Sequence, residues 1–109
     1  MTDHELDVLA RRVGEALAAR GLWLATAESC TGGWIAEVVT ATSGSSAWFD
    51  RGWVTYSNEA KQQMLGVPVA TIAAEGAVSK AVVCAMAEGA LAHSNASHAI
   101  AVSGIAGPS

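Results

Sequence analysis

Apolar side chains recur at helical spacing at the start of the chain and form short continuous runs further along. The initial helix is indicated by apolar residues three or four positions apart: Leu6, Leu9, Val13 and Leu17. Gly21 follows where a left-handed cap would end that helix. Residues 22–27 and 99–102 are apolar runs without charge, so we expect two strands that are covered on both faces. Residues 52–56 also have the composition of a strand.

Helical patterns separate these strands. A helix is expected after Gly33, on the apolar spacing of Ile35, Val38 and Val39, and residues 43–46 then have the composition of a loop. A short helix capped by Ser57 or Asn58 is expected to end near Gly66, because Pro68 prevents it from continuing.

A longer helix is expected to follow its cap at Ser79. Its apolar stripe consists of Val83, Met86, Ala87, Ala90 and Leu91. Cys84 lies within this helix and is expected to be a small core residue. The alternation of helices and strands predicts an α/β domain with a largely covered sheet.

Composition and charge exclude several classes of protein. Hydrophobic residues make up 51% and charged residues 15%, which indicates a folded chain. The net charge of −4 argues against nucleic acid or an anionic membrane as a partner. No apolar run is long enough to span a bilayer, and the polar, acidic amino terminus does not resemble a secretory signal. We therefore expect a cytoplasmic protein.

Three polar loops follow the three expected strands. They comprise residues 28–33 (ESCTGG), 57–61 (SNEAK) and 103–107 (SGIAG). In open α/β sheets, ligands bind outside the carboxyl ends of the strands, so the three loops are expected to meet in one crevice. Their hydroxyls, glycines and amine are the signal for a functional site.

A serine and a lysine in these loops form a candidate catalytic pair. Ser29 lies at a strand-to-helix bend, where it can attack a carbonyl while neighbouring amides hold the oxyanion. Lys61, if neutral, can accept the serine proton, and Tyr56 can relay that proton or hold the amine. Each residue also has a structural interpretation. Ser29 and Thr31 can be helix caps, Lys61 a solvated helix lysine and Tyr56 a half-buried strand residue.

Other reactive side chains leave alternatives open. Cys30 competes with Ser29 as the nucleophile. Glu28 and Glu59 can orient Lys61 or a hydroxyl, or they can be favourable acids in the first turn of a helix. Trp48, Phe49 and Trp53 can line a pocket for a flat ring or pack in the core.

The histidines do not indicate a metal site. His93 and His98 are five residues apart, which matches no helical pair of metal ligands, and His93 is expected at a helix end. We therefore expect no metal.

Four segments together resemble the carboxy-terminal domain of the competence/damage-inducible CinA family. They are TAESCTGG at 26–33, YSNEAK at 56–61, GAVS at 76–79 and SGIAGP at 103–108. The resemblance covers the whole chain and includes SSAWF at 45–49. It implies a single three-layer α/β/α domain over residues 1–109. Because the chain ends in a glycine-proline loop directly after its last strand, we expect this domain to be incomplete at its carboxy-terminal end.

The resemblance also implies an activity. Members of the family deamidate nicotinamide mononucleotide to nicotinic acid mononucleotide and ammonia, without a cofactor or metal, as homodimers or larger assemblies. By motif position, Ser29 is the nucleophile, Lys61 its base and Tyr56 an assisting residue. The residues expected to surround the nucleotide are Thr31, Gly32, Gly33, Ser46, Ser103 and Gly104. The alternative is a non-catalytic nucleotide-binding module in which Lys61 contacts a phosphate.

Overall fold

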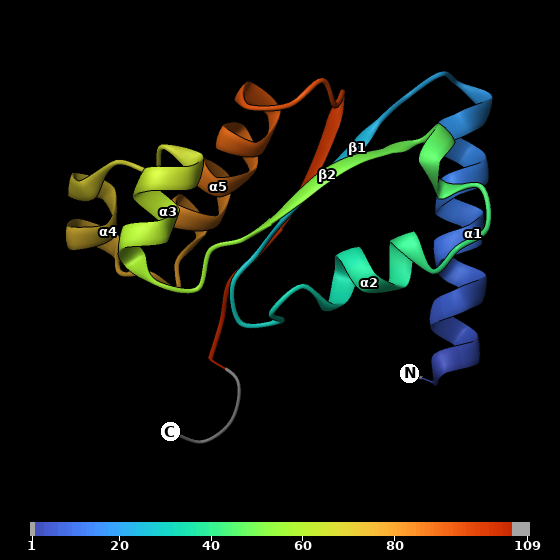
Figure 1. Ribbon diagram of the computed structural model, residues 1–109. Coiled ribbons are helices and arrows are strands. Elements are labelled where there is room, and N and C mark those ends of the chain that lie inside the picture. Colours follow the sequence, from blue (N-terminus) through green and yellow to red (C-terminus); the bar gives the residue numbers. More distant parts are fainter. Residues whose placement is uncertain (1, 106–109) are drawn as a thin grey trace.

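The computed structural model describes residues 2–105. Its elements are α1 (Asp3–Ala19), β1 (Leu24–Glu28), α2 (Trp34–Thr40), the 3₁₀ turn η1 (Ser45–Ala47), β2 (Phe49–Val54), α3 (Asn58–Leu65), α4 (Val69–Glu75), α5 (Lys80–Ala92) and β3 (His98–Val102). Figure 1 shows α1 and α2 on one side of the sheet and α3, α4 and α5 on the other. The predicted three-layer α/β/α fold is confirmed.

The sheet is parallel, with its strands in the order β2-β1-β3. All residues of β1 are buried, as predicted for a strand covered on both faces. The same prediction for residues 99–102 is wrong, because Ile100 in β3 is 43% exposed. Ile100 is in register with Thr26 and lies toward residues of α1 and α2. Within residues 2–105 no helix covers this edge of the sheet (Figure 1).

Alternating side chains of β1 separate two core clusters. Ala25 and Ala27 face α5 and pack with its residues Val82 and Met86, whereas Leu24 packs against Val39 and Trp48 on the opposite face. The core on the α5 side depends on small residues, since a Cβ on Gly89 would lie 2.0 Å from the Leu65 carbonyl oxygen. Helices α3 and α5 therefore pack with their backbones in close contact.

The predicted helix caps are found in the structure. The Ser57 hydroxyl accepts a hydrogen bond from the Ala60 N–H at 3.0 Å, and that of Ser79 accepts one from the Val82 N–H at 3.1 Å. Gly66 ends α3 in the left-handed conformation, with φ of 70°. Gly21, just after α1, has φ of 66°. At these positions local sequence determines where a helix begins or ends.

Two predictions about helices need correction. Pro68 does not only stop α3 but also begins α4, a helix that the sequence pattern did not predict, because a proline is compatible with a helix start. The buried residues of α5 are Val82, Met86, Gly89 and Ala90, so its apolar face is rotated by about one residue from the predicted stripe. Leu91 is exposed for that reason, and so is Cys84, which is not a core residue.

The strand boundaries also differ from the prediction. Strand β1 runs from Leu24 to Glu28 rather than over 22–27. Strand β2 runs from Phe49 to Val54 rather than over 52–56, and its register with β1 shifts next to Leu24. Tyr56 is therefore outside the strand, and part of the predicted loop at 43–46 belongs to η1.

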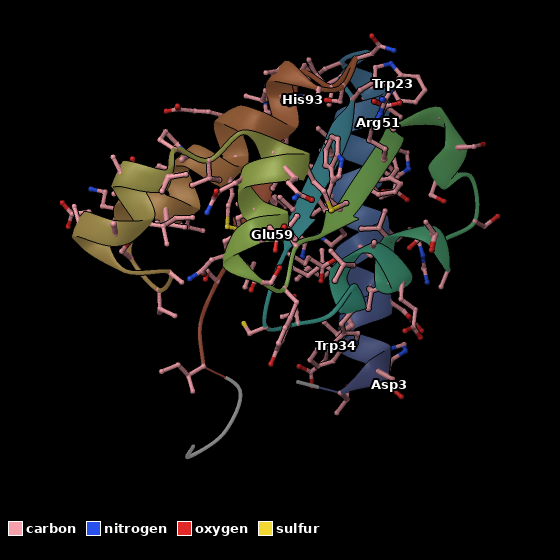
Figure 2. The ribbon with its side chains drawn as sticks, turned by 60° about the vertical axis from the view of Figure 1, so that its left-hand side comes forward. Asp3, Trp23, Trp34, Arg51, Glu59 and His93 are labelled. Atoms are coloured by element: carbon pink, nitrogen blue, oxygen red, sulfur yellow. The ribbon has the colours of Figure 1, made fainter. Side chains whose placement is uncertain are left out.

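An apolar groove lies between α1, α2 and the edge strand β3. It encloses about 330 Å³, and side chains that contribute to it include Leu6, Leu9, Val13, Trp34, Val38 and Ile100. Figure 2 shows Trp34 close to the start of α1, where Asp3 lies. Among the helices of the described part of the chain, none combines the length and apolarity needed to cross a bilayer.

Candidate active site

The three loops at the carboxyl ends of the strands meet in one pocket, as expected for an open α/β sheet. The pocket has a volume of about 250 Å³. Its lining comes from all three loops and from the turn before α5: Ser29, Cys30, Tyr56, Asn58, Lys61, Ala77, Val78, Ser103, Gly104 and Ile105. Residues 106 and 107 of the third predicted loop lie outside the described residues.

Ser29 and Lys61 contact each other at the base of this pocket. Lys61 Nζ lies 3.1 Å from Ser29 Oγ, and both side chains are buried. Ser29 is held at the end of β1 by its N–H, which donates to the Val102 carbonyl at 3.1 Å. Lys61 is held on the first turn of α3, where its N–H donates to the carbonyl of the cap residue Ser57 at 3.1 Å.

The amine of Lys61 has two further partners, and both are main-chain carbonyls. Nζ donates to the Thr55 oxygen at 3.0 Å and to the Tyr56 oxygen at 3.1 Å. The only ion pair within residues 2–105 joins Arg51 to Asp50, so Lys61 lacks a carboxylate partner there. Its burial lowers the pKa of the amine below the usual value for lysine, while the nearby Cys30 acts in the opposite direction with a smaller effect.

The three partners define what a neutral Lys61 can do. The two carbonyls can only accept hydrogen bonds, so they take the two N–H groups of the neutral amine. The remaining tetrahedral position of Nζ, which holds its lone pair, then faces Ser29 Oγ. This arrangement suits a base that removes the serine proton.

Glu28 does not orient Lys61 but holds the loop that follows Ser29. Its side chain is 1% exposed and faces α2, where Oε1 accepts from the Ile35 N–H at 2.8 Å and Oε2 from the Ala36 N–H at 3.0 Å. Oε1 also accepts from the Thr31 hydroxyl at 2.7 Å. Both alternatives for Glu28 are thus partly realised, since it caps a helix and orients a hydroxyl. Glu59 is exposed and contacts Gln63.

The pocket includes some of the residues expected around a nucleotide. Ser103 and Gly104 line it, and the Ser103 hydroxyl donates to the Ala77 carbonyl at 3.0 Å. Tyr56 also lines the pocket, and its side chain is 75% exposed. Its contact with the Lys61 amine is made by the main-chain carbonyl and not by the phenol.

The other expected residues lie elsewhere. Thr31, Gly32 and Gly33 are in the same loop as Ser29 but do not line the pocket. Gly33 begins α2 with φ of 104°, which favours glycine. Ser46 lies in η1, before the start of β2, and therefore at the opposite end of the sheet.

Several side chains with open interpretations have structural roles. Trp48 is 3% exposed in one core cluster, and Trp53 packs against the other. His93 is at the end of α5, with Nδ1 2.8 Å from the Gly89 carbonyl oxygen, as predicted. Figure 2 shows His93 and Arg51 near each other, and Arg51 donates to the His93 carbonyl at 3.1 Å. The residues that the structure describes contain no cluster of three or more potential metal ligands.

One residue of the site was missed from the sequence. Thr55 is fully buried next to Lys61, and its hydroxyl has no hydrogen-bond partner within the described residues. A threonine near a strand end carries no distinctive sequence signal, because its hydroxyl and methyl groups suit both a polar and an apolar environment.

Comparison with known proteins gives a consistent result. The family model of the CinA C-terminal domain matches residues 6–109. The chain is 61% identical over 108 residues to the nicotinamide-nucleotide amidohydrolase PncC of Escherichia coli K12, covering 99% of this chain and 66% of that protein. It is 54% identical to the Pseudomonas putida protein of the same name, covering 94% of this chain and 64% of that protein.

Solved structures show the same similarity. The competence/damage inducible protein CihA of Agrobacterium tumefaciens superposes with a TM-score of 0.94 at 50% identity, covering 100% of this chain and 65% of that one. A CinA superfamily protein of Klebsiella pneumoniae 700603 gives a TM-score of 0.93 at 47% identity, covering 100% of this chain and 66% of that one. The chain thus spans about two thirds of the length of these relatives.

Proposed function

The chain belongs to the CinA C-terminal domain family, and we propose that it hydrolyses the carboxamide of nicotinamide mononucleotide to nicotinic acid mononucleotide and ammonia. Relatives in Escherichia coli and Pseudomonas putida are named nicotinamide-nucleotide amidohydrolases. The observation that carries the proposal is the 3.1 Å contact between Lys61 Nζ and Ser29 Oγ, at the base of a pocket at the carboxyl edge of the sheet.

In the first half of the reaction, Ser29 Oγ attacks the carboxamide carbon and its proton passes to Lys61 Nζ. The carbonyl oxygen becomes an oxyanion, which needs hydrogen-bond donors. The N–H of Gly32 is not free for this, because it donates to the Ser29 carbonyl at 3.1 Å. Within residues 2–105 the N–H groups of Cys30, Thr31 and Gly33 donate to no main-chain carbonyl. Of the three only Cys30 lines the pocket, so we assign its N–H to the oxyanion. Lys61 then protonates the leaving nitrogen, and ammonia departs from an acyl-enzyme.

In the second half, water attacks the ester carbonyl of the acyl-enzyme while Lys61 accepts a proton from the water. Collapse of this intermediate releases the carboxylate product, and Lys61 returns the proton to Ser29 Oγ. The same amine acts as base and then as acid in each half of the reaction. Its pKa must therefore lie below the usual value for lysine, so that the neutral form is available. Burial without a carboxylate partner lowers the pKa of Lys61 in the required direction.

The rest of the substrate would occupy the remaining lining of the pocket. Ser103 and Gly104 offer polar groups at the end of β3, and we assign the exposed Tyr56 side chain to a contact with the substrate. The net charge of −4 repels an anionic nucleotide, so local donors at strand ends must compensate for its phosphate. Self-association and a cytoplasmic location stay predictions from the sequence.

Single-turnover measurements on two variants test this proposal. We expect Ser29→Ala and Lys61→Ala each to reduce ammonia release by about 1,000-fold or more, because each removes a member of one catalytic unit, while the nucleotide still binds. The matched control is Cys30→Ala in the same pocket, which should retain ammonia release within about tenfold if Ser29 is the nucleophile. Loss of nucleotide binding in Lys61→Ala, with no ammonia released by the native chain, would instead favour the non-catalytic binding module.

A further inference from the structure

The unpaired hydroxyl of Thr55 is not used in the reaction described above. Thr55 is 0% exposed, and its Oγ1 is one of two buried side-chain oxygens without a hydrogen bond within the described residues. The other is Thr26 Oγ1. A buried hydroxyl without a partner destabilises a fold, because it has lost its hydrogen bonds to water. A valine would fill nearly the same volume at either position without that cost.

The backbone places the Thr55 side chain on the same face of the sheet as Ser29. Neighbouring side chains show this alternation, because Trp53 packs in the cluster beneath α5 and the side chain of Val54 faces Gly33 at the start of α2. Thr55 follows on the face of Trp53. The pairing of Glu28 with Val54 continues through the Thr55 N–H, which donates to the Glu28 carbonyl at 2.8 Å. Ser29 and Thr55 thus directly follow the last paired residues of β1 and β2, and Lys61 Nζ contacts both of them.

The hydrogen bonds of the neighbouring polar atoms indicate which of them the Thr55 hydroxyl can bind. Lys61 Nζ already has three partners, Ser29 Oγ and the carbonyls of Thr55 and Tyr56, so its tetrahedral positions are filled. Among the residues that the structure describes, Ser29 Oγ has one partner, and it can accept a further hydrogen bond.

We propose that Thr55 supplies a second hydrogen bond to the nucleophile, its hydroxyl donating to Ser29 Oγ as that oxygen transfers its proton to Lys61. This inference rests on the proposed function, since it needs Ser29 to lose a proton. As charge develops on Oγ, the hydrogen bond strengthens and stabilises the transition state more than the resting state. The hydroxyl breaks no hydrogen bond within residues 2–105 to make this one, because it has none there.

The rate at which Ser29 reacts with a fluorophosphonate probe tests the inference without using the nucleotide. In that reaction Ser29 Oγ bonds to phosphorus, fluoride leaves and the serine proton passes to Lys61. Intact-mass spectrometry follows the labelling, and Ser29→Ala gives the background. We expect Thr55→Val to slow labelling by at least about tenfold, as for loss of a hydrogen bond to a charged group, and Thr55→Ser to restore it within about threefold.

Thr26→Val is the matched control, because it removes the other buried hydroxyl that lacks a hydrogen bond within the described part of the chain. That hydroxyl lies on the face toward Gly52 and Ala36. Thr26→Val should label at the native rate. Both valine variants should unfold at the same or a higher urea concentration than the native chain, which separates an effect on reactivity from one on folding. If Thr55→Val does not fold, comparison of Thr55→Ala with Thr55→Ser isolates the hydroxyl in the same way.

The possible failures are distinguishable. Native-rate labelling of Thr55→Val, equal slowing by Thr26→Val, or no recovery in Thr55→Ser would overturn the role of Thr55 and leave the Ser29–Lys61 pair intact. Absence of Ser29 labelling in the native chain would overturn the proposed nucleophile, and the role of Thr55 with it.

Discussion

At the scale of single residues, the buried amine of Lys61 links stability to pH. Burial lowers its pKa in the folded chain below the ordinary value of 10.5. At a pH between the lowered pKa and the ordinary one, Lys61 is protonated in the unfolded chain but not in the folded chain. Folding therefore becomes more favourable as the pH rises through that interval. Below the lowered pKa, each unit of difference between the two pKa values reduces the free energy of unfolding by about 1.4 kcal/mol relative to its value at high pH.

We therefore expect the free energy of unfolding of Lys61→Met, relative to that of the native chain, to fall as the pH rises toward about 10.5. Urea denaturation of both proteins across this range gives the difference in free energy of unfolding. Lys80→Met is the matched control, since Lys80 is the other lysine of the sequence and its side chain is exposed. A difference in free energy of unfolding between Lys61→Met and the native chain that is the same at every pH would contradict the lowered pKa.

The sequence was informative about the site where a general rule of topology applies. Ser29 and Lys61 are 32 residues apart, yet each follows a strand, and strand ends of a parallel sheet meet at one edge. The partners of Lys61 could not be predicted, because two of them are main-chain carbonyls whose direction depends on the backbone of residues 55 and 56. Nor could the sequence predict that the Thr55 hydroxyl is buried without a hydrogen-bond partner among the described residues.

At the scale of secondary structure, Gly89 sets how closely α3 and α5 approach. A Cβ at this position would meet the Leu65 carbonyl oxygen at 2.0 Å, and a backbone atom cannot move aside as a flexible side chain can. Because α3 also carries Lys61, the contact positions the amine relative to the sheet. Packing between these helices and chemistry at the pocket are thus coupled.

We expect Gly89→Ala to destabilise the chain by about 1–3 kcal/mol, although alanine has the higher helix propensity, because overpacking must displace α3. Ammonia release should fall as well, since the distance between Lys61 and Ser29 changes with α3. Urea denaturation and the ammonia assay measure the two effects. Glu88→Ala, on the exposed side of the same helix, should change stability by no more than about 0.5 kcal/mol. A Gly89→Ala variant more stable than the native chain would contradict this, because it would show that α3 can move away from the added Cβ without loss of stability.

Element boundaries were predictable where a cap determines them and not where packing does. Ser57, Gly66 and Ser79 begin or end helices through local hydrogen bonds and a left-handed turn, so sequence is sufficient. The buried face of α5 is set by the approach to Leu65 through Gly89, and a pattern of apolar residues assigns no weight to a glycine. The position of Cys84 was mispredicted for this reason.

At the scale of the whole molecule, the apolar groove between α1, α2 and β3 is an exposed hydrophobic surface. We expect it to bind the dye anilinonaphthalene sulfonate, and Leu9→Glu, which places a charge on a residue 47% exposed at the groove, to weaken the fluorescence enhancement. The free energy of unfolding should change by about 1 kcal/mol or less, because Leu9 already contacts water.

Met64→Glu is the control for this experiment. Met64 is 42% exposed on α3 and does not line the groove, so its replacement should leave dye fluorescence unchanged. Equal loss of fluorescence in both variants would place the dye elsewhere on the surface.

The central position of β1 determines whether Ser29 keeps its geometry when other parts of the chain open locally. Its amides pair on both sides with β2 and β3, and all its residues are buried. Such amides exchange their hydrogens with solvent only when the whole domain opens, whereas short outer helices such as α4 open more often. Because Ser29 directly follows this strand, fraying at the periphery would leave its geometry intact, and the serine would remain preorganised until the domain melts as a unit.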